Sequence, residues 1–401
     1  MQRRQFLRQA GATLAVASTA AVASCTRQPV TSASAVPATV PPPAVRIRPD
    51  VAELAPVRAQ ADRITGVYVC TRPFRAAGPR IETEKLGHKT LVHNYGHGGS
   101  GWSLSWGSGT LAVRMAQATG ARAIGVIGCG AIGLTSAILA QRAGLAVRIY
   151  AKALPPDVYS MRASGLWTPD SRLCDAAHAP ALAVRWEEMA RISHATYQSL
   201  LGVPGRPIEW IDGYALADAP MGHGHAAIPG EPEYGQFQDR VPELLPHPVD
   251  LPPGSHPFAQ PYVRRYATLM FNISTYARML MADFLAAGGK IEVREFSHPR
   301  ELLKLPEHTL INATGYGAKA LFNDDSIVPV RGQTARLIPQ PEVTYGLRTR
   351  HVSMVPRSDG LLVQVLDDTG DFNNADTTPD RAASEAAVRE LAAVMAGMRR
   401  G

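Results

Sequence analysis

The clearest pattern of hydrophobic positions lies in residues 123–152. An uninterrupted apolar run, Ile124 to Ile127, predicts a strand that is buried on both faces. A glycine-rich turn follows, and Leu134 to Arg142 predict a helix that ends at Gly144. A second apolar run, Ala146 to Tyr150, predicts the next strand. The order strand, glycine turn, helix, strand is typical of a dinucleotide-binding unit.

The glycines of this turn have the spacing Gly128-x-Gly130-x-x-Gly133. We expect Gly128 to make the tight turn, Gly130 to let a pyrophosphate approach the backbone, and Gly133 to let the helix pack on the strand. The start of the helix, with Ala131 and Ile132, would present N–H groups to the phosphates. The alternative is a purely structural glycine turn in a protein that holds no cofactor.

The second strand ends without the acid that ordinarily holds the ribose of NAD. Its end reads Tyr150-Ala151-Lys152, which disfavours NAD by the usual rule. A variant FAD site stays open, with Ala151 and Lys152 near the adenosine ribose or phosphate.

The first residues carry a pattern of their own. The pair Arg3-Arg4 precedes a run of small and apolar residues, Ala10 to Ala23, that contains no acid. This layout is typical of a twin-arginine export signal, and a membrane anchor is disfavoured because about 15 weakly apolar residues are too few to span a bilayer. Val22-Ala23-Ser24-Cys25 resembles a lipobox in which Cys25 would be lipidated, while ordinary cleavage after Ala23 stays open. We expect an exported lipoprotein at the periplasmic face of a bacterial membrane.

Charge and cysteine content narrow the partners. The formal charge is +7, and loss of the signal's three arginines lowers it to +4. Because no dense cluster of Lys and Arg is interleaved with aromatics, nucleic acid is not an expected partner. The cysteines, at positions 25, 70, 129 and 174, lack metal-ligand spacing, so we expect neither a metal site nor a disulfide.

Several further segments resemble signatures of the D-amino-acid oxidase family. They are Ala163-Ser164-Gly165-Leu166-Trp167, Asn312-Ala313-Thr314-Gly315, Val330-Arg331-Gly332-Gln333 and, most specifically, Val92 to Gly107, which reads VHNYGHGGSGWSLSWG. Thr71 to Arg75 and Pro79 to Glu82 are similar to the "RPxRP…R" segment that precedes the last signature in the family.

The order of these motifs differs from the family's order. The segment of about residues 58–118 resembles the family's last part, yet here it precedes the glycine turn. The chain ends in a predicted helix, Arg381 to Met398, which in the family would lead into that segment. This pattern indicates a circular permutation, which requires chain ends close together on the surface. The alternative is an ordinary oxidase with a coincidental glycine-rich repeat.

The resemblance implies an α/β fold, in which a Rossmann-like FAD-binding domain is interleaved with a second, α+β substrate domain that contains a mixed or antiparallel sheet. The expected boundaries are signal and lipobox 1–25, flexible linker 26–44, FAD-binding domain 45–182 (permuted segment 58–118, glycine-turn unit 121–152), substrate domain 183–270, FAD-binding domain 271–335, substrate domain 336–380 and C-terminal helix 381–401.

The resemblance also implies site residues. Arg72 matches the arginine that binds the substrate carboxylate, and the carbonyl of Gly99 would accept from the substrate amine. His93 and His97 are expected to be structural. The expected FAD contacts come from the glycine turn and from five other segments: Gly128, Gly130, Ala131, Ile132, Gly133, Ala151, Lys152, Ser164, Gly165, Leu166, Phe296, Thr314, Gly98, Ser100, Gly101, Trp102 and Ser103, with N–H groups of residues 98–103 facing the flavin.

The substrate lid departs from the family. Two tyrosines are expected shortly after the "RGQ" strand, but Ser353 stands nearest the second and the first has no counterpart. Tyr345, His351 and Ser353 are the lid candidates, together with an arginine pair, Arg348 and Arg350, that would suit an acidic or larger substrate.

The implied activity is the oxidation of a D-amino acid or a related amine-bearing carboxylate, with hydride transfer to flavin N5, giving a 2-oxo acid, ammonia and hydrogen peroxide. FAD and oxygen are the expected partners, and the oligomeric state, including a homodimer, stays open. The first alternative is a flavin dehydrogenase that passes electrons to a membrane carrier. The second is a non-catalytic, lipid-anchored binding protein.

Overall fold

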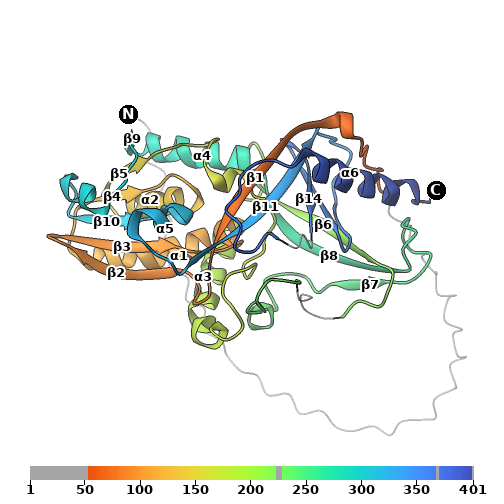
Figure 1. Cartoon of the computed structure of the whole chain (residues 1–401), viewed down its shortest axis with the longest axis horizontal. Helices are drawn as coiled ribbons and strands as arrows, with labels where there is room; N and C mark the ends of the chain where they lie inside the picture. Colours follow the sequence, from red (N-terminus) through yellow and green to blue (C-terminus); the bar gives the residue numbers. More distant parts are fainter. Residues whose placement is uncertain (1–52, 223–227, 367–369, 400–401) are drawn as a thin grey trace, which may run out of the picture. The chain divides into compact units, whose positions relative to one another are not determined.

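The computed structural model describes residues 53–222, 228–366 and 370–399, so the predicted signal, Cys25 and the linker lie outside the described residues. Two sheets organise this part of the chain, one with six strands and one with eight (Figure 1). No helix among the described residues is long and apolar enough to cross a membrane.

The six-stranded sheet contains the predicted glycine-turn unit. Its order is β2 (Arg80–Leu86), β3 (Lys89–Tyr95), β10 (Thr309–Asn312), β4 (Ala123–Ile127), β5 (Ala146–Ala151) and β9 (Lys290–Val293). All neighbours are parallel except β2 and β3, which form an antiparallel edge. The two predicted strands of the unit are confirmed as β4 and β5, and the central position of β4 explains why it carries no polar side chain.

Helices pack on this sheet and on each other. They are α1 (Gly101–Gln117), α2 (Ala131–Arg142), α3 (Ala179–Gln198), α4 (Ile273–Ala286) and the short α5 (Ala318–Phe322). The helix predicted from Leu134 begins three residues earlier, at Ala131, because Gly130 is its N-cap. Helix α1 approaches α3 at Gly107, where a Cβ would lie only 2.2 Å from the carbonyl oxygen of Met189.

The eight-stranded sheet is mixed. Its order is β1 (Ile64–Arg75), β11 (Ile327–Leu337), β14 (Gly360–Val365), β13 (Val352–Arg357), β12 (Gly346–Arg348), β6 (Ile208–Ala217), β8 (Tyr262–Phe271) and β7 (Val249–Leu251). Only β12 and β6 pair in parallel. The expected fold class, a Rossmann-like domain with a second domain built on a mixed sheet, is confirmed.

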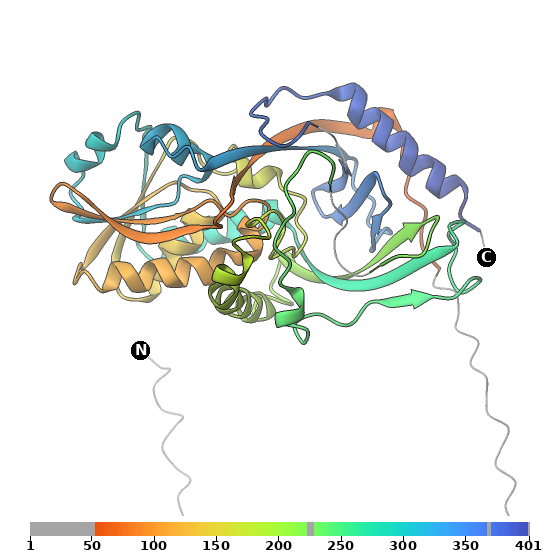
Figure 2. The same cartoon turned by 60° about the horizontal axis from the view of Figure 1, so that its bottom comes forward.

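Helix α6 (Arg381–Ala396) covers one face of the eight-stranded sheet (Figure 2). The carboxylate of Asp380 caps its start by accepting from the N–H of Ala383 at 3.0 Å. Its buried side chains, Ala387, Val388, Leu391, Val394 and Met395, recur at helical spacing and pack into the core beneath it. This helix corresponds to the one predicted at 381–398.

The sheets divide the chain differently from the expected domain boundaries. Strand β1 falls inside the segment assigned to the FAD-binding domain, but it pairs along its length with β11 in the eight-stranded sheet. Helix α3, assigned to the substrate domain, packs on α1. The physical reason is that β1 and β11 are long strands whose pairing joins distant segments, and no local pattern reveals a strand's partner.

The segment that resembles the family's last part, 58–118, contributes β1, β2, β3 and α1. Helix α1 leads into β4 through the five residues 118–122. At the other end, the N–H of Val57 lies 3.1 Å from the sulfur of Met395 in α6. The two ends of the described chain therefore lie beside each other, as a permuted order requires.

Candidate active site

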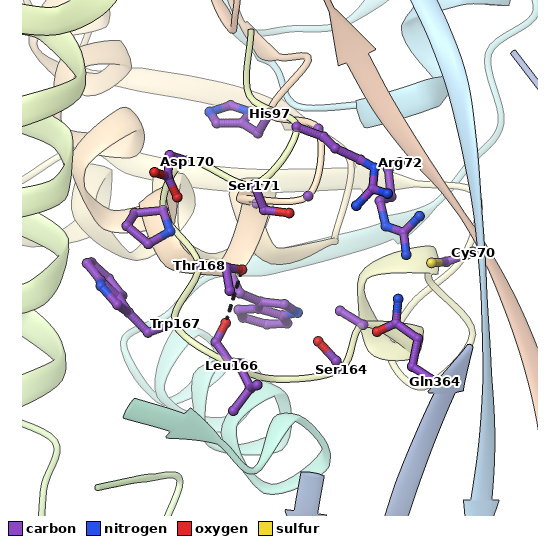
Figure 3. Close-up of a pocket in the computed structure, with 18 of the residues that line it drawn as sticks. Cys70, Arg72, His97, Ser164, Leu166, Trp167, Thr168, Asp170, Ser171 and Gln364 are labelled. Carbon is purple, nitrogen blue, oxygen red and sulfur yellow. Dashed lines mark hydrogen bonds between the residues drawn. The ribbon is translucent and has the colours of Figure 1, made fainter. Parts of the chain in front are cut away.

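A cavity of about 2280 Å³ extends from the glycine turn to the eight-stranded sheet. Its lining comes from β1, the turns after β3, β4, β5 and β10, and strands of the large sheet. Figure 3 shows part of it, with Arg72 and Cys70 from β1, Gln364 from β14, and Ser164 to Ser171 from the loop between β5 and α3. This volume is large enough for a dinucleotide cofactor together with a substrate.

The glycine turn has the shape that a pyrophosphate site requires. Gly128 has a φ of +112°, and a Cβ there would lie 2.4 Å from the carbonyl oxygen of Ala313. A Cβ at Gly133 would lie 2.1 Å from the carbonyl oxygen of Gly128, so this glycine allows α2 to pack on the turn. Gly130, Ala131 and Ile132 line the cavity at the start of α2. The residues present therefore fit a bound dinucleotide.

The end of β5 lacks the acid that ordinarily holds the ribose, as the sequence indicated. Ala151 and Lys152 line the cavity, and Lys152 forms an exposed ion pair of 3.4 Å with Glu295, which also lines it. Phe296, one of the predicted contacts, lies beside Glu295 and lines the cavity as well. The acid at this end of the cavity thus comes from the segment after β9, which the sequence pattern does not reveal.

The HNYGHGG segment lies against the loop that follows β5. A Cβ at Gly98 would lie 1.7 Å from the carbonyl oxygen of Arg172, and the φ of Gly98 is +54°. The N–H groups of Gly98 and Gly99 donate to the carbonyls of Pro73 and Ser171, each at 2.9 Å. The expectation that these two N–H groups face a flavin is therefore wrong, because backbone carbonyls already accept from them.

Several predicted contacts hold the cavity wall together without lining it. The hydroxyl of Ser100 donates to the carbonyl of Ser171 at 3.1 Å, and that of Ser103 accepts from the N–H of Thr168 at 2.8 Å. Gly165, with a φ of +93°, accepts from the N–H of Phe271 at 2.7 Å. Ser100, Ser103, Gly133 and Gly165 are absent from the lining and support the wall instead, so their direct contact with FAD stays a prediction.

The other predicted contacts reach the cavity. The indole of Trp102 lies there and donates to the carbonyl of Ser160 at 2.7 Å, and Thr314 is held by its hydroxyl, which donates to Asn312 at 2.7 Å. The remaining ones that line it are Gly98, Gly99, Gly101, Ser164 and Leu166.

The two histidines of the segment differ. His93 is buried on β3, where its ring lies 3.0 Å from Glu84 and 3.1 Å from the amide of Asn312. His97 lines the cavity, and its buried Nε2 has no hydrogen-bond partner in the described part of the chain. Burial lowers the pKa of His97 to about 3, so its ring is neutral near pH 7.

The side chain of Arg72, on β1, lies across the neighbouring strand β11. Its guanidinium donates to the carbonyl of Arg331 and lies 4.0 Å from the carboxylate of Asp371. A Cβ at Gly332 would lie 2.2 Å from Arg72 Nη2, so only glycine leaves room for this position. The side chain faces the cavity beside Cys70 (Figure 3).

The lid candidates lie in different parts of the structure. Tyr345 is wrong as a lid residue: it lies in the core beneath α6, and its hydroxyl donates to the carbonyl of Ala55 at 2.9 Å. His351 and Ser353 line the cavity, as do Arg348 and Arg350. The sequence offered no signal for Gln364, Tyr266 or Asp371, which also line it from distant segments.

The comparisons with known proteins agree with this arrangement. The chain matches the family described as "FAD dependent oxidoreductase" over residues 6–115 and 123–400. It is 26% identical to a D-amino-acid oxidase of Dictyostelium discoideum over 67% of this chain and 72% of that protein. It is 27% identical to a D-amino-acid oxidase of Rubrobacter xylanophilus over 68% and 77%.

Among solved structures, glycine oxidase from Bacillus cereus has 14% identity and a TM-score of 0.45, covering 69% of this chain and 82% of that one. The family match, which spans almost the whole chain, decides the identity. The protein belongs to the FAD dependent oxidoreductase family, and FAD is its cofactor.

Proposed function

We propose that the protein oxidises a D-amino acid or a related amine-bearing carboxylate to an imino product, which water converts to a 2-oxo acid and ammonia. Bound FAD would take up the two electrons and pass them to oxygen, which would leave as hydrogen peroxide. The observation that carries the proposal is that Arg72 and the glycine turn line one continuous cavity.

Arg72 is the proposed carboxylate-binding residue. Its guanidinium faces the cavity and has a carboxylate, Asp371, 4.0 Å away, a separation longer than a hydrogen bond. A guanidinium offers a planar pair of N–H donors that matches a carboxylate, and the contact with the Arg331 carbonyl holds it in place. Arg72 would therefore orient the substrate and leave its Cα–H free to react.

Gly99 is the proposed acceptor for the substrate amine. It is half-buried at the cavity wall, and its N–H is bonded to the carbonyl of Ser171, so the backbone position is held. A Cβ at Gly99 would lie 2.6 Å from the Ser171 hydroxyl, which indicates that the loop is closely packed there. Leu166 and Trp167 also line the cavity, and their apolar side chains would exclude water from the reacting atoms.

The proposal is tested by anaerobic mixing of the purified holoenzyme with pairs of D- and L-amino acids. We expect the flavin absorption to bleach with D-enantiomers, and peroxide and ammonia to form in equal amounts after air is admitted. Bleaching that is followed by electron transfer to quinones with little peroxide would favour the dehydrogenase. No bleaching with any amine-bearing carboxylate would refute the proposed activity.

We also propose that the protein works at the periplasmic face of a bacterial membrane as a lipoprotein. Arg3-Arg4 and the Val22 to Cys25 stretch support this proposal. Replacement of Arg3 and Arg4 by lysine should leave the protein in the cytoplasm, and Cys25→Ser should abolish incorporation of labelled lipid. Unchanged fractionation and labelling would refute it.

A further inference from the structure

A row of polar side chains crosses the eight-stranded sheet on its cavity face. Thr334 of β11, Gln364 of β14, Ser353 of β13 and Arg348 of β12 are direct partners in the sheet register. We call these four residues the polar row. Each of them lines the cavity.

The direction of the polar row is set by the backbone. The residues next to it, Ala335, Val363, Met354 and Leu347, face the other side and are buried beneath α6. Because successive side chains of a strand point to opposite faces, packing of this apolar set under α6 turns the polar row into the cavity.

The polar row has unused hydrogen-bonding capacity. The hydroxyl of Thr334 is buried and has no hydrogen-bond partner among the residues that the structure describes. The side chains of Gln364, Ser353 and Arg348 make no hydrogen bond or ion pair to any residue in the described part of the chain. Of the four residues, Thr334 is buried, Ser353 and Gln364 are partly exposed, and Arg348 is exposed. Because a buried hydroxyl nearly always has a partner, the unpaired Thr334 beside three cavity-lining polar side chains indicates a surface that contacts a ligand.

Arg348 also differs from two other arginines of the cavity in its pairing with carboxylates. Arg172 is paired with Glu231 at 2.8 Å, and Arg264 with Asp250 at 2.5 Å. Arg348 has no such carboxylate among the described residues; it lies near the phenol of Tyr266, whose pKa burial raises and Arg348 lowers. Among the described residues, therefore, no carboxylate compensates the positive charge at the far end of the polar row.

The separation of Arg72 and Arg348 sets the length of a ligand that contacts both. The guanidinium of Arg72 lies over Gly332 of β11, and β12 is three strands away in the sheet order. At roughly 4.8 Å between strands, the backbone of Arg348 lies about 14 Å across the sheet from the strand over which the Arg72 guanidinium sits. A substrate with a single carboxylate could not contact both arginines, so a second anionic group would have to lie several ångströms from the carboxylate that Arg72 binds.

We propose that the substrate is elongated and carries a second anionic group, which Arg348 binds, while Thr334, Gln364 and Ser353 contact polar atoms along its length. This inference rests on the proposed function, in which Arg72 binds the carboxylate next to the amine. The chemical class of the proposed substrate is a long amine-bearing carboxylate with a second acidic group far from the first.

The length is tested with simple dicarboxylates, whose binding needs no turnover. The FAD-loaded protein is titrated with succinate, adipate, suberate and sebacate, and the change in flavin absorption reports the dissociation constant. Because each carboxylate would lie about 2.8 Å from its guanidinium, the contacts at both ends shorten the ligand that fits. We expect adipate or suberate to bind tightest, and the monomethyl ester of the tightest ligand to bind about fivefold more weakly, as for a partly exposed ion pair.

Arg348→Gln should abolish the difference between the acid and its ester, whereas Arg265→Gln should preserve it. Arg265 is a matched control because it is an exposed arginine of β8 that faces the other side of the sheet. Equal binding of acid and ester by the unchanged protein, or a difference that persists in Arg348→Gln, would overturn the inference. Loss of flavin reduction by all D-amino acids would instead refute the proposed function, because the dicarboxylate titration does not depend on it.

Discussion

Replacement of Gly332 by alanine should damage substrate binding without damaging the fold. A Cβ at this position would lie 2.2 Å from Nη2, 2.5 Å from Cζ and 2.7 Å from Nη1 of Arg72. These are the far end of a flexible side chain, and Gly332 does not have a positive φ, so the backbone can accept alanine. The guanidinium would have to retreat by about 1.2 Å to reach the ordinary contact distance of 3.4 Å.

Such a shift is larger than a hydrogen bond to a bound carboxylate tolerates. A hydrogen bond to a charged group contributes about 1.5–3 kcal/mol, which corresponds to a roughly ten- to hundredfold change in affinity. We therefore expect Gly332→Ala to lower kcat/KM by about this factor, with FAD content and thermal stability close to those of the unchanged protein.

The assay is steady-state oxidation of the best D-amino acid, combined with Arg72→Gln in a double-mutant cycle. Because both changes remove the same contact, Gly332→Ala should add little in the Arg72→Gln background. Gly346→Ala is the control, since a Cβ there would meet its nearest atom at an ordinary 3.5 Å. Full activity of Gly332→Ala, or equal losses in both backgrounds, would refute the assignment of Arg72.

Three further predictions follow from the geometry. Gly128→Ala should lose FAD, because its Cβ would lie 2.4 Å from a backbone oxygen at a φ of +112°; flavin released on denaturation measures this. His97 has a pKa of about 3 when folded and about 6.5 when unfolded, so the folded protein binds fewer protons between these values. The free energy of unfolding of the protein should therefore fall as the pH drops below 6.5, by up to about 1.4 kcal/mol per pH unit, as urea titrations would record. A rearranged chain that is opened after Gly120, with a short linker joining the segments near Val57 and Met395 and without the residues before Val57, should fold and bind FAD.

Each of these predictions has a control. Gly120→Ala, at a φ of +74° with no atom within 4 Å, separates backbone strain from collision; equal FAD loss in both variants would contradict the account of Gly128. His97→Asn should flatten the decline of stability below pH 6.5, and an unchanged slope would remove His97 as its cause. A rearranged chain that stays insoluble or colourless would contradict the permuted order.

The glycine-turn unit could be predicted from the sequence because its information is local. Strands β4 and β5 and helix α2 follow from apolar runs and glycine spacing within thirty residues. The resemblance of motifs extended this prediction to FAD and to Arg72, whose position facing the cavity agrees with it. The same motifs did not reveal environments that are non-local: Ser100 and Ser103 support the wall, and Tyr345 lies in the core.

Only the tertiary structure decided which residues surround the end of the cavity where the substrate would bind. Strand β1 meets β11, more than 250 residues away, and this pairing alone places Arg72 over Gly332. Asp371, Glu295 and the polar row also come from separate segments, since the sheet order follows from which apolar faces can be covered together. The sequence by itself determined that a dinucleotide unit forms, because hydrophobic period and glycine conformation act between near neighbours. It did not determine the cavity's composition, because strand pairing joins residues that no local pattern connects.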